Sequence, residues 1–197
     1  PASTSTVLRQ AWPFWMSSIL NQVRVLDTTV VGAIASPLAA GLYSAAQKIV
    51  TPLLLIPASL SQVILPHASR PSSDPKRLAV GTTGAFLASY ALVAPLCFAS
   101  SEILSLLFGP DYAEGGVILT WMLLGLPMLA LAGPLVAILQ GISAENAVAI
   151  NSAIYASAAA AGMVIGAVVA GGEGTAAALA VAAALRIPLL LVSIFRA

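Results

Sequence analysis

The sequence predicts an all-α, polytopic membrane protein with six transmembrane helices. Hydrophobic residues make up 59% of the 197 residues and charged residues only 8%, whereas about a quarter of an ordinary soluble domain is charged. The apolar residues gather in six runs, each at least as long as the roughly 20 residues that a helix needs to cross a bilayer. The Lys and Arg residues outside these runs fall on one side of the expected membrane, as in multi-pass proteins. This composition excludes an ordinary soluble domain.

The first span, residues 12–36, is apolar except for a narrow polar stripe. Asn21, Arg24 and Asp27 lie near its middle. At 100° per residue, Asn21 and Arg24 share one arc of the helix, and Asp27 lies close beside it. A charge at this depth costs about 2.5–3.5 kcal/mol, so such groups normally face the interior of a bundle or a watery cavity.

The second span, residues 38–69, is long for one crossing and contains Pro52, Pro57 and Pro66. Each proline removes a backbone hydrogen bond and kinks the helix. Lys48 lies ten residues inside this span, which corresponds to about 15 Å of helix. We therefore expect its ammonium group near the middle of the membrane.

The other four spans are expected at residues 78–100, 116–140, 147–170 and 175–195. The fifth is rich in alanine and has Gly162 and Gly166 at a spacing that suits close helix packing. The sixth contains Arg186 near its middle. Residues 101–115, between the third and fourth spans, are too short to cross and are expected to form an interfacial hairpin. All six spans are expected to form a single transmembrane lobe, residues 1–197.

The positions of the charges outside the spans predict an orientation. Five cations lie on one side of the expected membrane: Arg9, Arg70, Lys76, Arg77 and Arg196. The opposite connections carry four acidic residues: Glu102, Asp111, Glu114 and Glu173. Because cytoplasmic loops are enriched in Lys and Arg, both ends of this chain are expected in the cytoplasm. The chain begins with Pro1 and has no initiator Met, so we expect it to be part of a longer protein.

The charges inside the spans predict a binding site. Arg24, Lys48 and Arg186 are expected at similar depth, against the single anion Asp27. Arg keeps its proton, so the excess positive charge predicts an anionic ligand in a water-filled cavity. A guanidinium group suits phosphate oxygens, and Asn21 is expected to join these cations in binding the substrate.

A structural interpretation of the same residues stays open. Arg24 and Asp27, three residues apart, could form only an internal salt bridge, with Asp27 as its anion or as a coupling group. Arg186 could extend its charge toward the membrane surface. No cofactor or metal is expected, because Cys97 is the only cysteine and the acidic residues lack the spacing of metal ligands.

Four stretches carry a resemblance to a known family: DTTVVG at 27–32, GLYSAAQKI at 41–49, IPASLSQVILP at 56–66 and LLFGPDYA at 106–113. In their order and spacing, the chain resembles the polysaccharide exporters, and O-antigen flippases above all, of the multidrug/oligosaccharidyl-lipid/polysaccharide (MOP) flippase superfamily. The resemblance implies one lobe of a V-shaped transporter with 12–14 helices. The chain is similar to its C-terminal lobe, and the N-terminal lobe of the same protein is the implied partner.

The same resemblance implies a function in polysaccharide biosynthesis. Such transporters flip undecaprenyl-pyrophosphate-linked oligosaccharide, for example a precursor of the lipopolysaccharide O-antigen, across the bacterial cytoplasmic (inner) membrane by alternating access. The expected partners are therefore the lipid-linked anionic oligosaccharide and membrane lipid, with no nucleic acid, and we expect no enzymatic activity.

Two other functions stay open at this point. A cation-coupled multidrug antiporter of the same superfamily would need carboxylates within the membrane, and Asp27 is the one present. A membrane-embedded glycosyltransferase or glycan polymerase would need a catalytic carboxylate in a loop near the membrane surface. The loops here are short and their acidic residues are scattered.

Overall fold

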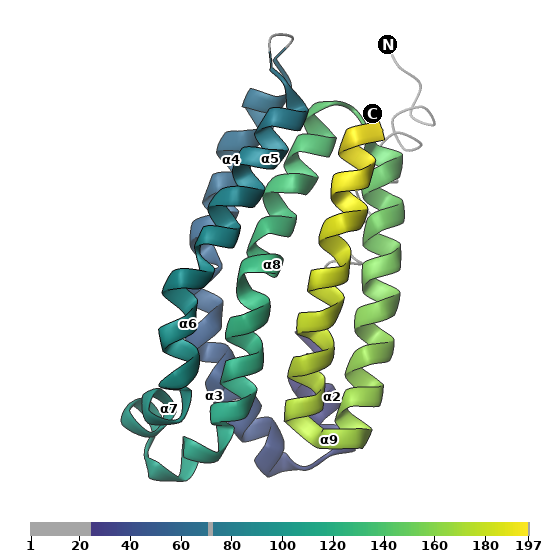
Figure 1. Ribbon diagram of the computed structural model, residues 1–197. Coiled ribbons are helices and arrows are strands. Elements are labelled where there is room, and N and C mark those ends of the chain that lie inside the picture. Colours follow the sequence, from purple (N-terminus) through teal and green to yellow (C-terminus); the bar gives the residue numbers. More distant parts are fainter. Residues whose placement is uncertain (1–24, 71–72, 197) are drawn as a thin grey trace, which may run out of the picture.

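The computed structural model describes residues 25–70 and 73–196, and every regular element in this part of the chain is a helix (Figure 1). The elements are α2 (Asp27–Ile34), α3 (Pro37–Leu53), α4 (Leu55–Ala68), α5 (Pro75–Ala88), α6 (Tyr90–Phe98), α7 (Ser100–Phe108), η2 (Pro110–Gly115), α8 (Gly116–Gly141) and α9 (Glu145–Arg196). The predicted all-α membrane fold is confirmed. Most of the first expected span, residues 12–24 with Asn21 and Arg24, lies outside the described residues.

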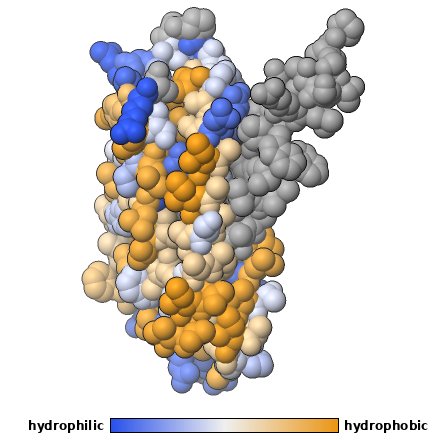
Figure 2. All heavy atoms as spheres, turned by 90° about the vertical axis from the view of Figure 1, so that its right-hand side faces the viewer, coloured by the Kyte–Doolittle hydropathy of each residue, from blue (hydrophilic) through white to orange (hydrophobic). Residues whose placement is uncertain are grey.

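Four helical stretches of the described chain are long and apolar enough to cross a membrane: Pro37–Ala68, Pro75–Phe98, Pro110–Gly141 and Glu145–Arg196. The molecule is a multi-pass membrane protein. On the face seen in Figure 2, hydrophobic side chains gather along the length of the helices and hydrophilic ones toward the two ends. Large apolar residues such as Ile56, Leu92 and Val169 are exposed along the spans, as expected for surfaces that contact lipid.

α9 contains the fifth and sixth expected spans as two antiparallel arms (Figure 1). The chain reverses at Ala170 and Gly171, and Gly171 has φ 57°, a left-handed conformation that glycine adopts without a steric penalty. The arms then approach closely, since a Cβ atom at Gly166 would collide with the backbone carbonyl of Gly174. The small residues of this helix therefore allow contact between the two backbones.

The second expected span is divided into two helices. α3 ends at Leu53, one turn before Pro57, and α4 begins at Leu55. A proline at position 57 cannot donate a hydrogen bond to the carbonyl of Leu53, which is four residues earlier. The break therefore lies where that backbone bond is missing, and the long span bends there.

The expected interfacial hairpin is a short helix, α7, followed by the 3-10 helix η2. It lies at the end of the bundle that also holds the α9 reversal (Figure 1). Gly109, with φ 107°, makes the turn between the two helices. Leu104 is fully buried, whereas Leu106 is 86% exposed. α7 thus has one side against the bundle and one apolar side on the surface.

α8 is the central helix and packs against α3, α4, α5, α6 and α9. Two clusters of buried side chains form along it. One includes Ile64, Leu135 and Leu190, and the other includes Tyr43 and Leu119. The loop between α4 and α5 and the C-terminus of α9 lie at the opposite end from α7 (Figure 1). We call this end, with Arg70, Lys76, Arg77 and Arg196, the basic end.

Candidate functional site

Arg186 lies buried between the two arms of α9, with 5% of its surface exposed. Its Cζ atom is 4.5 Å from the centre of the Tyr155 ring, and its terminal Nη2 donates to Ser152 Oγ at 3.4 Å. Both partners are on the first arm and Arg186 is on the second. The guanidinium therefore stays between the arms and does not extend to the membrane surface.

Arg186 does not use all of its hydrogen-bond donors within the described chain. A guanidinium has five N–H donors, yet Nε has no hydrogen-bond partner among the described residues. Within residues 25–70 and 73–196, the only ion pair joins Arg77 to Asp74 at the basic end. The contact with the aromatic ring contributes about 0.5–2 kcal/mol, whereas a buried charge without an anion costs several kcal/mol. Contacts within the described chain therefore leave the charge of Arg186 only partly compensated.

The sequence around Arg186 turns it inward. Leu179, Ala182, Ala183 and Leu190 are buried on the same arm as Arg186. Arg186 lies four residues after Ala182, three after Ala183 and four before Leu190, so it shares their face of the helix. Because alanines surround it, the arms pack closely enough for its side chain to reach Tyr155.

Asp27 forms the second buried polar site, at the start of α2, with 1% of its surface exposed. Tyr43 donates its hydroxyl to Oδ2 at 3.1 Å, and Gln47 Nε2 lies 3.2 Å from both carboxylate oxygens. The backbone N–H of Thr28 donates to Oδ1 at 2.6 Å. Thr28 Oγ1 lies 3.0 Å from Gln47 Oε1, which orients the amide so that its NH₂ faces the carboxylate. The described partners of Asp27 are thus neutral donors.

α2 contacts both sites through different sides. Asp27 bonds to Tyr43 and Gln47 of α3, while Val30, one turn later, packs against the cluster that includes Tyr155 on α9. The Asp27 carboxylate and Tyr155, whose ring contacts the Arg186 guanidinium, are therefore both next to the short helix α2.

Lys48 lies elsewhere. Its side chain is exposed, and Nζ is 6.0 Å from the centre of the Phe108 ring on α7. Arg186 is 15 residues beyond Gly171, which is roughly 22 Å along its arm from the end that holds α7. The structure therefore does not bring Lys48 and Arg186 together. Asn21 and Arg24, the other two predicted substrate-binding residues, lie outside the described residues.

Sequence reasoning missed the partners of both sites. Tyr43 and Gln47 are four residues apart and share one face of α3, but nothing in the sequence indicates that this face meets Asp27. Tyr155 and Asn151 are four residues apart, but nothing in this spacing indicates that Tyr155 meets Arg186. Asn151 donates to Ser193 Oγ at 3.0 Å, a bond between the α9 arms. Nothing in the sequence marks Ser152 as a partner of Arg186, because a single serine is common in an alanine-rich helix.

Residues 2–115, more than half of the chain, match the family described as polysaccharide biosynthesis protein. The chain belongs to that family. This confirms the resemblance to the polysaccharide exporters of the MOP superfamily. No curated protein matches this family member in sequence.

The fold of this polysaccharide biosynthesis protein is similar to that of a solved flippase, described as lipid II flippase MurJ in the inward closed conformation. The TM-score is 0.76 at 20% sequence identity, and the match covers 95% of this chain and 42% of the flippase chain. At this identity the likeness shows the fold alone. The chain spans less than half the length of that flippase.

Proposed function

We propose that this chain is one lobe of a transporter, not an enzyme, that flips an anionic lipid-linked oligosaccharide across the bacterial cytoplasmic membrane. The substrate class is undecaprenyl-pyrophosphate-linked oligosaccharide, as used for O-antigen and related polysaccharides. The lobe works with an N-terminal lobe of the same protein, and the two rock against each other in alternating access. Its basic end faces the cytoplasm, following the positive-inside rule.

One observation carries the proposal: Arg186 is a buried guanidinium at membrane depth whose charge no described carboxylate balances. A group of this kind is costly within a membrane and usually marks a substrate path. Its Nε lacks a described partner, so it can still donate to phosphate oxygen. The family and the fold likeness to a lipid II flippase support the same direction.

The mechanism assigns different tasks to the charged residues. Tyr155 and Ser152 orient Arg186, whose N–H groups bind the pyrophosphate when the lobes open the site to water. Lys48 is exposed on this lobe, where its ammonium can meet a ligand from the space between the lobes. Arg24 and Asn21 contribute further donors from the first span, and Asp27 acts as a coupling group or as the salt-bridge partner of Arg24.

A cation-coupled antiporter is the second candidate, and the surroundings of Asp27 favour it. The carboxylate is buried and its described partners are neutral donors, so no described cation competes with a proton or a metal cation for it. In such a protein Asp27 would carry function and Arg186 would be structural. The two candidates therefore differ in which charge transport requires.

The test uses the full-length protein in cells whose surface glycan depends on it. Arg186→Met removes the charge but keeps much of the side-chain volume, Arg186→Lys keeps the charge, and Lys76→Ala removes an exposed cation at the basic end as the control. Surface glycan and lipid-linked precursor on the inner leaflet are measured at matched protein levels. Losing a hydrogen bond to a charged group corresponds to roughly 10- to 100-fold, so we expect export to fall by at least tenfold in Arg186→Met.

The control separates this result from a general effect of charge. We expect Lys76→Ala to export normally and Arg186→Lys to keep part of the activity. Normal export by Arg186→Met would remove Arg186 from the mechanism. If Asp27→Asn abolished export in the same assay while Arg186→Met did not, export would depend on cation coupling through Asp27 and not on anion binding by Arg186.

A further inference from the structure

An open groove of about 640 Å³ lies at the basic end, between the end of α4 and the start of α5. Its volume is within the roughly 300–1,000 Å³ of typical ligand sites. His67 and Arg70 line one side, and Ser73, Arg77 and Thr82 line the other. The groove thus combines two guanidinium groups with an imidazole and two hydroxyls, all of them groups that bind phosphate.

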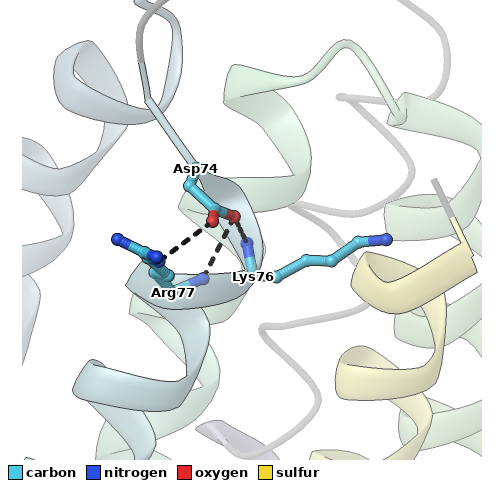
Figure 3. A network of polar contacts seen from close by, with 3 residues as sticks. All are labelled: Asp74, Lys76 and Arg77. Atoms are coloured by element: carbon cyan, nitrogen blue, oxygen red, sulfur yellow. Dashed lines mark hydrogen bonds and ion pairs between the residues drawn. The ribbon is translucent and has the colours of Figure 1, made fainter.

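Asp74 is the acidic residue that lines this groove, and its carboxylate is already engaged (Figure 3). Oδ1 caps α5 by accepting from the backbone N–H groups of Lys76 at 3.0 Å and Arg77 at 3.3 Å. Oδ2 pairs with Arg77 Nε at 3.4 Å. This pair is exposed, so it is weak, and it uses Nε rather than the terminal amino groups of Arg77. The groove therefore keeps a positive character.

The neighbouring cation lies outside the groove. Figure 3 shows Lys76 and Arg77 extending to opposite sides of α5, with Lys76 directed toward the end of α9. Lys76 does not line the groove. The loop thus contains two kinds of cation that sequence alone does not distinguish.

The depth of the groove indicates what can reach it. It lies between Ala68, the last residue of one apolar stretch, and Pro75, the first residue of the next. The ends of transmembrane helices lie at the level of lipid headgroups. Guanidinium groups bind phosphate oxygens through short charge-assisted bonds, and basic residues at this level attract anionic lipids.

We infer that this groove binds the phosphate group of an anionic lipid from the surrounding leaflet. Arg70 and Arg77 hold the phosphate oxygens, and Thr82 donates its hydroxyl. The inference goes beyond the proposed transport, because the groove is separate from Arg186 and requires only that the chain spans a membrane. It also differs from the positive-inside rule, which assigns the same effect to every cation of the basic end.

The test measures binding of dioctanoyl phosphatidylglycerol to the purified full-length protein in a neutral detergent, by native mass spectrometry. Arg70→Ala with Arg77→Ala removes two cations from the groove. Lys76→Ala with Arg196→Ala removes two cations from the same end but outside the groove, and is the matched control. Dioctanoyl phosphatidylcholine reports non-specific lipid binding, and glycerol 3-phosphate serves as a soluble competitor.

We expect the groove variant to bind phosphatidylglycerol roughly tenfold more weakly, given the contribution of each basic residue near a membrane surface. The control should change by less than about twofold, and neither variant should alter phosphatidylcholine binding. Equal losses in the two double variants, or no loss in either, would overturn the site. If glycerol 3-phosphate displaced bound phosphatidylglycerol as effectively as free phosphatidylglycerol does, a lipid would not be the occupant of the groove. Glycan export does not enter this measurement, so its outcome is independent of the proposed transport.

Discussion

The two buried polar sites differ in how completely their neighbours satisfy them. Asp27 receives hydrogen bonds from Tyr43, Gln47 and Thr28, whereas Arg186 has one long bond to Ser152, a ring beneath it and an Nε without a described partner. A buried group with complete partners contributes to stability, and removing it leaves those partners unsatisfied. A buried charge with incomplete partners costs stability. The difference indicates that Asp27 holds α2 to α3, and it supports the proposal above that Arg186 serves in binding.

The largest effect on stability should follow removal of the Asp27 carboxylate. Asp27→Ala removes the carboxylate that accepts from the Tyr43 hydroxyl and from the half-buried Gln47 amide, which we expect to lower the free energy of unfolding by roughly 3 kcal/mol. Asp27→Asn keeps an acceptor oxygen and should lose less. Chemical unfolding of the full-length protein in detergent measures both. Equal stability of Asp27→Ala and the wild type would contradict the role of Asp27 in joining the two helices.

Arg186→Met should act in the opposite direction on stability. Replacing a buried, poorly compensated charge with an apolar side chain is often neutral or stabilising by about 1–4 kcal/mol. We expect an unchanged or higher free energy of unfolding together with the loss of export described above. A large loss of stability in Arg186→Met would make its role structural and remove the contrast with Asp27.

The ring of Tyr155 should have a smaller effect, detectable as a coupling energy. In a double-mutant cycle of unfolding, Tyr155→Leu and Arg186→Met should couple by about 1 kcal/mol, the size of a buried cation–π contact. Tyr155→Phe keeps a ring, so its coupling energy with Arg186→Met in the same kind of cycle should be close to zero. If Phe and Leu gave the same coupling energy, the ring would not support the guanidinium.

Ser152→Ala should have the smallest effect. Its bond to Arg186 measures 3.4 Å, which is long for a hydrogen bond, so we expect a loss of less than about 0.5 kcal/mol. Export should also stay close to normal, because Tyr155 still orients the guanidinium. A loss comparable to that of Tyr155→Leu would show that the hydroxyl is the main support.

Hydropathy alone predicted the fold class, because the bilayer sets both the length and the polarity of each crossing. Hydropathy placed the start of the third span at residue 78, three residues after α5 begins at Pro75. Asp74 followed by Pro75 is a typical helix beginning, and the Asp74 side chain caps the helix, but a count of apolar residues does not register it. The break at Leu54 between α3 and α4 was harder to predict from the sequence. Three prolines occur in that span, and hydropathy does not indicate which of them divides it.

The candidate site was predictable only in part. The sequence indicates how deep in the membrane a side chain lies, but the packing of the helices decides in which direction it points. Counting residues estimates how far along its helix Lys48 lies, but its direction depends on which face of α3 packs inward. That face is Tyr43, Ala46, Gln47 and Val50, so Lys48 points away from Asp27. Asp27 and Arg186 were identified by their charge, whereas their partners come from other helices or from the other arm of α9. The binding role of Arg24, Lys48, Arg186 and Asn21 stays a prediction.

The backbone contact between Gly166 and Gly174 constrains how the lobe can move. Helices separated by long side chains can slide as those side chains change rotamer, but two backbones in contact have no such intermediate layer. In the transport cycle proposed above, we therefore expect the hairpin of α9 to move as one rigid piece, with Tyr155 and Arg186 kept face to face. Any change in the surroundings of the guanidinium must come from a ligand or from a helix outside this hairpin.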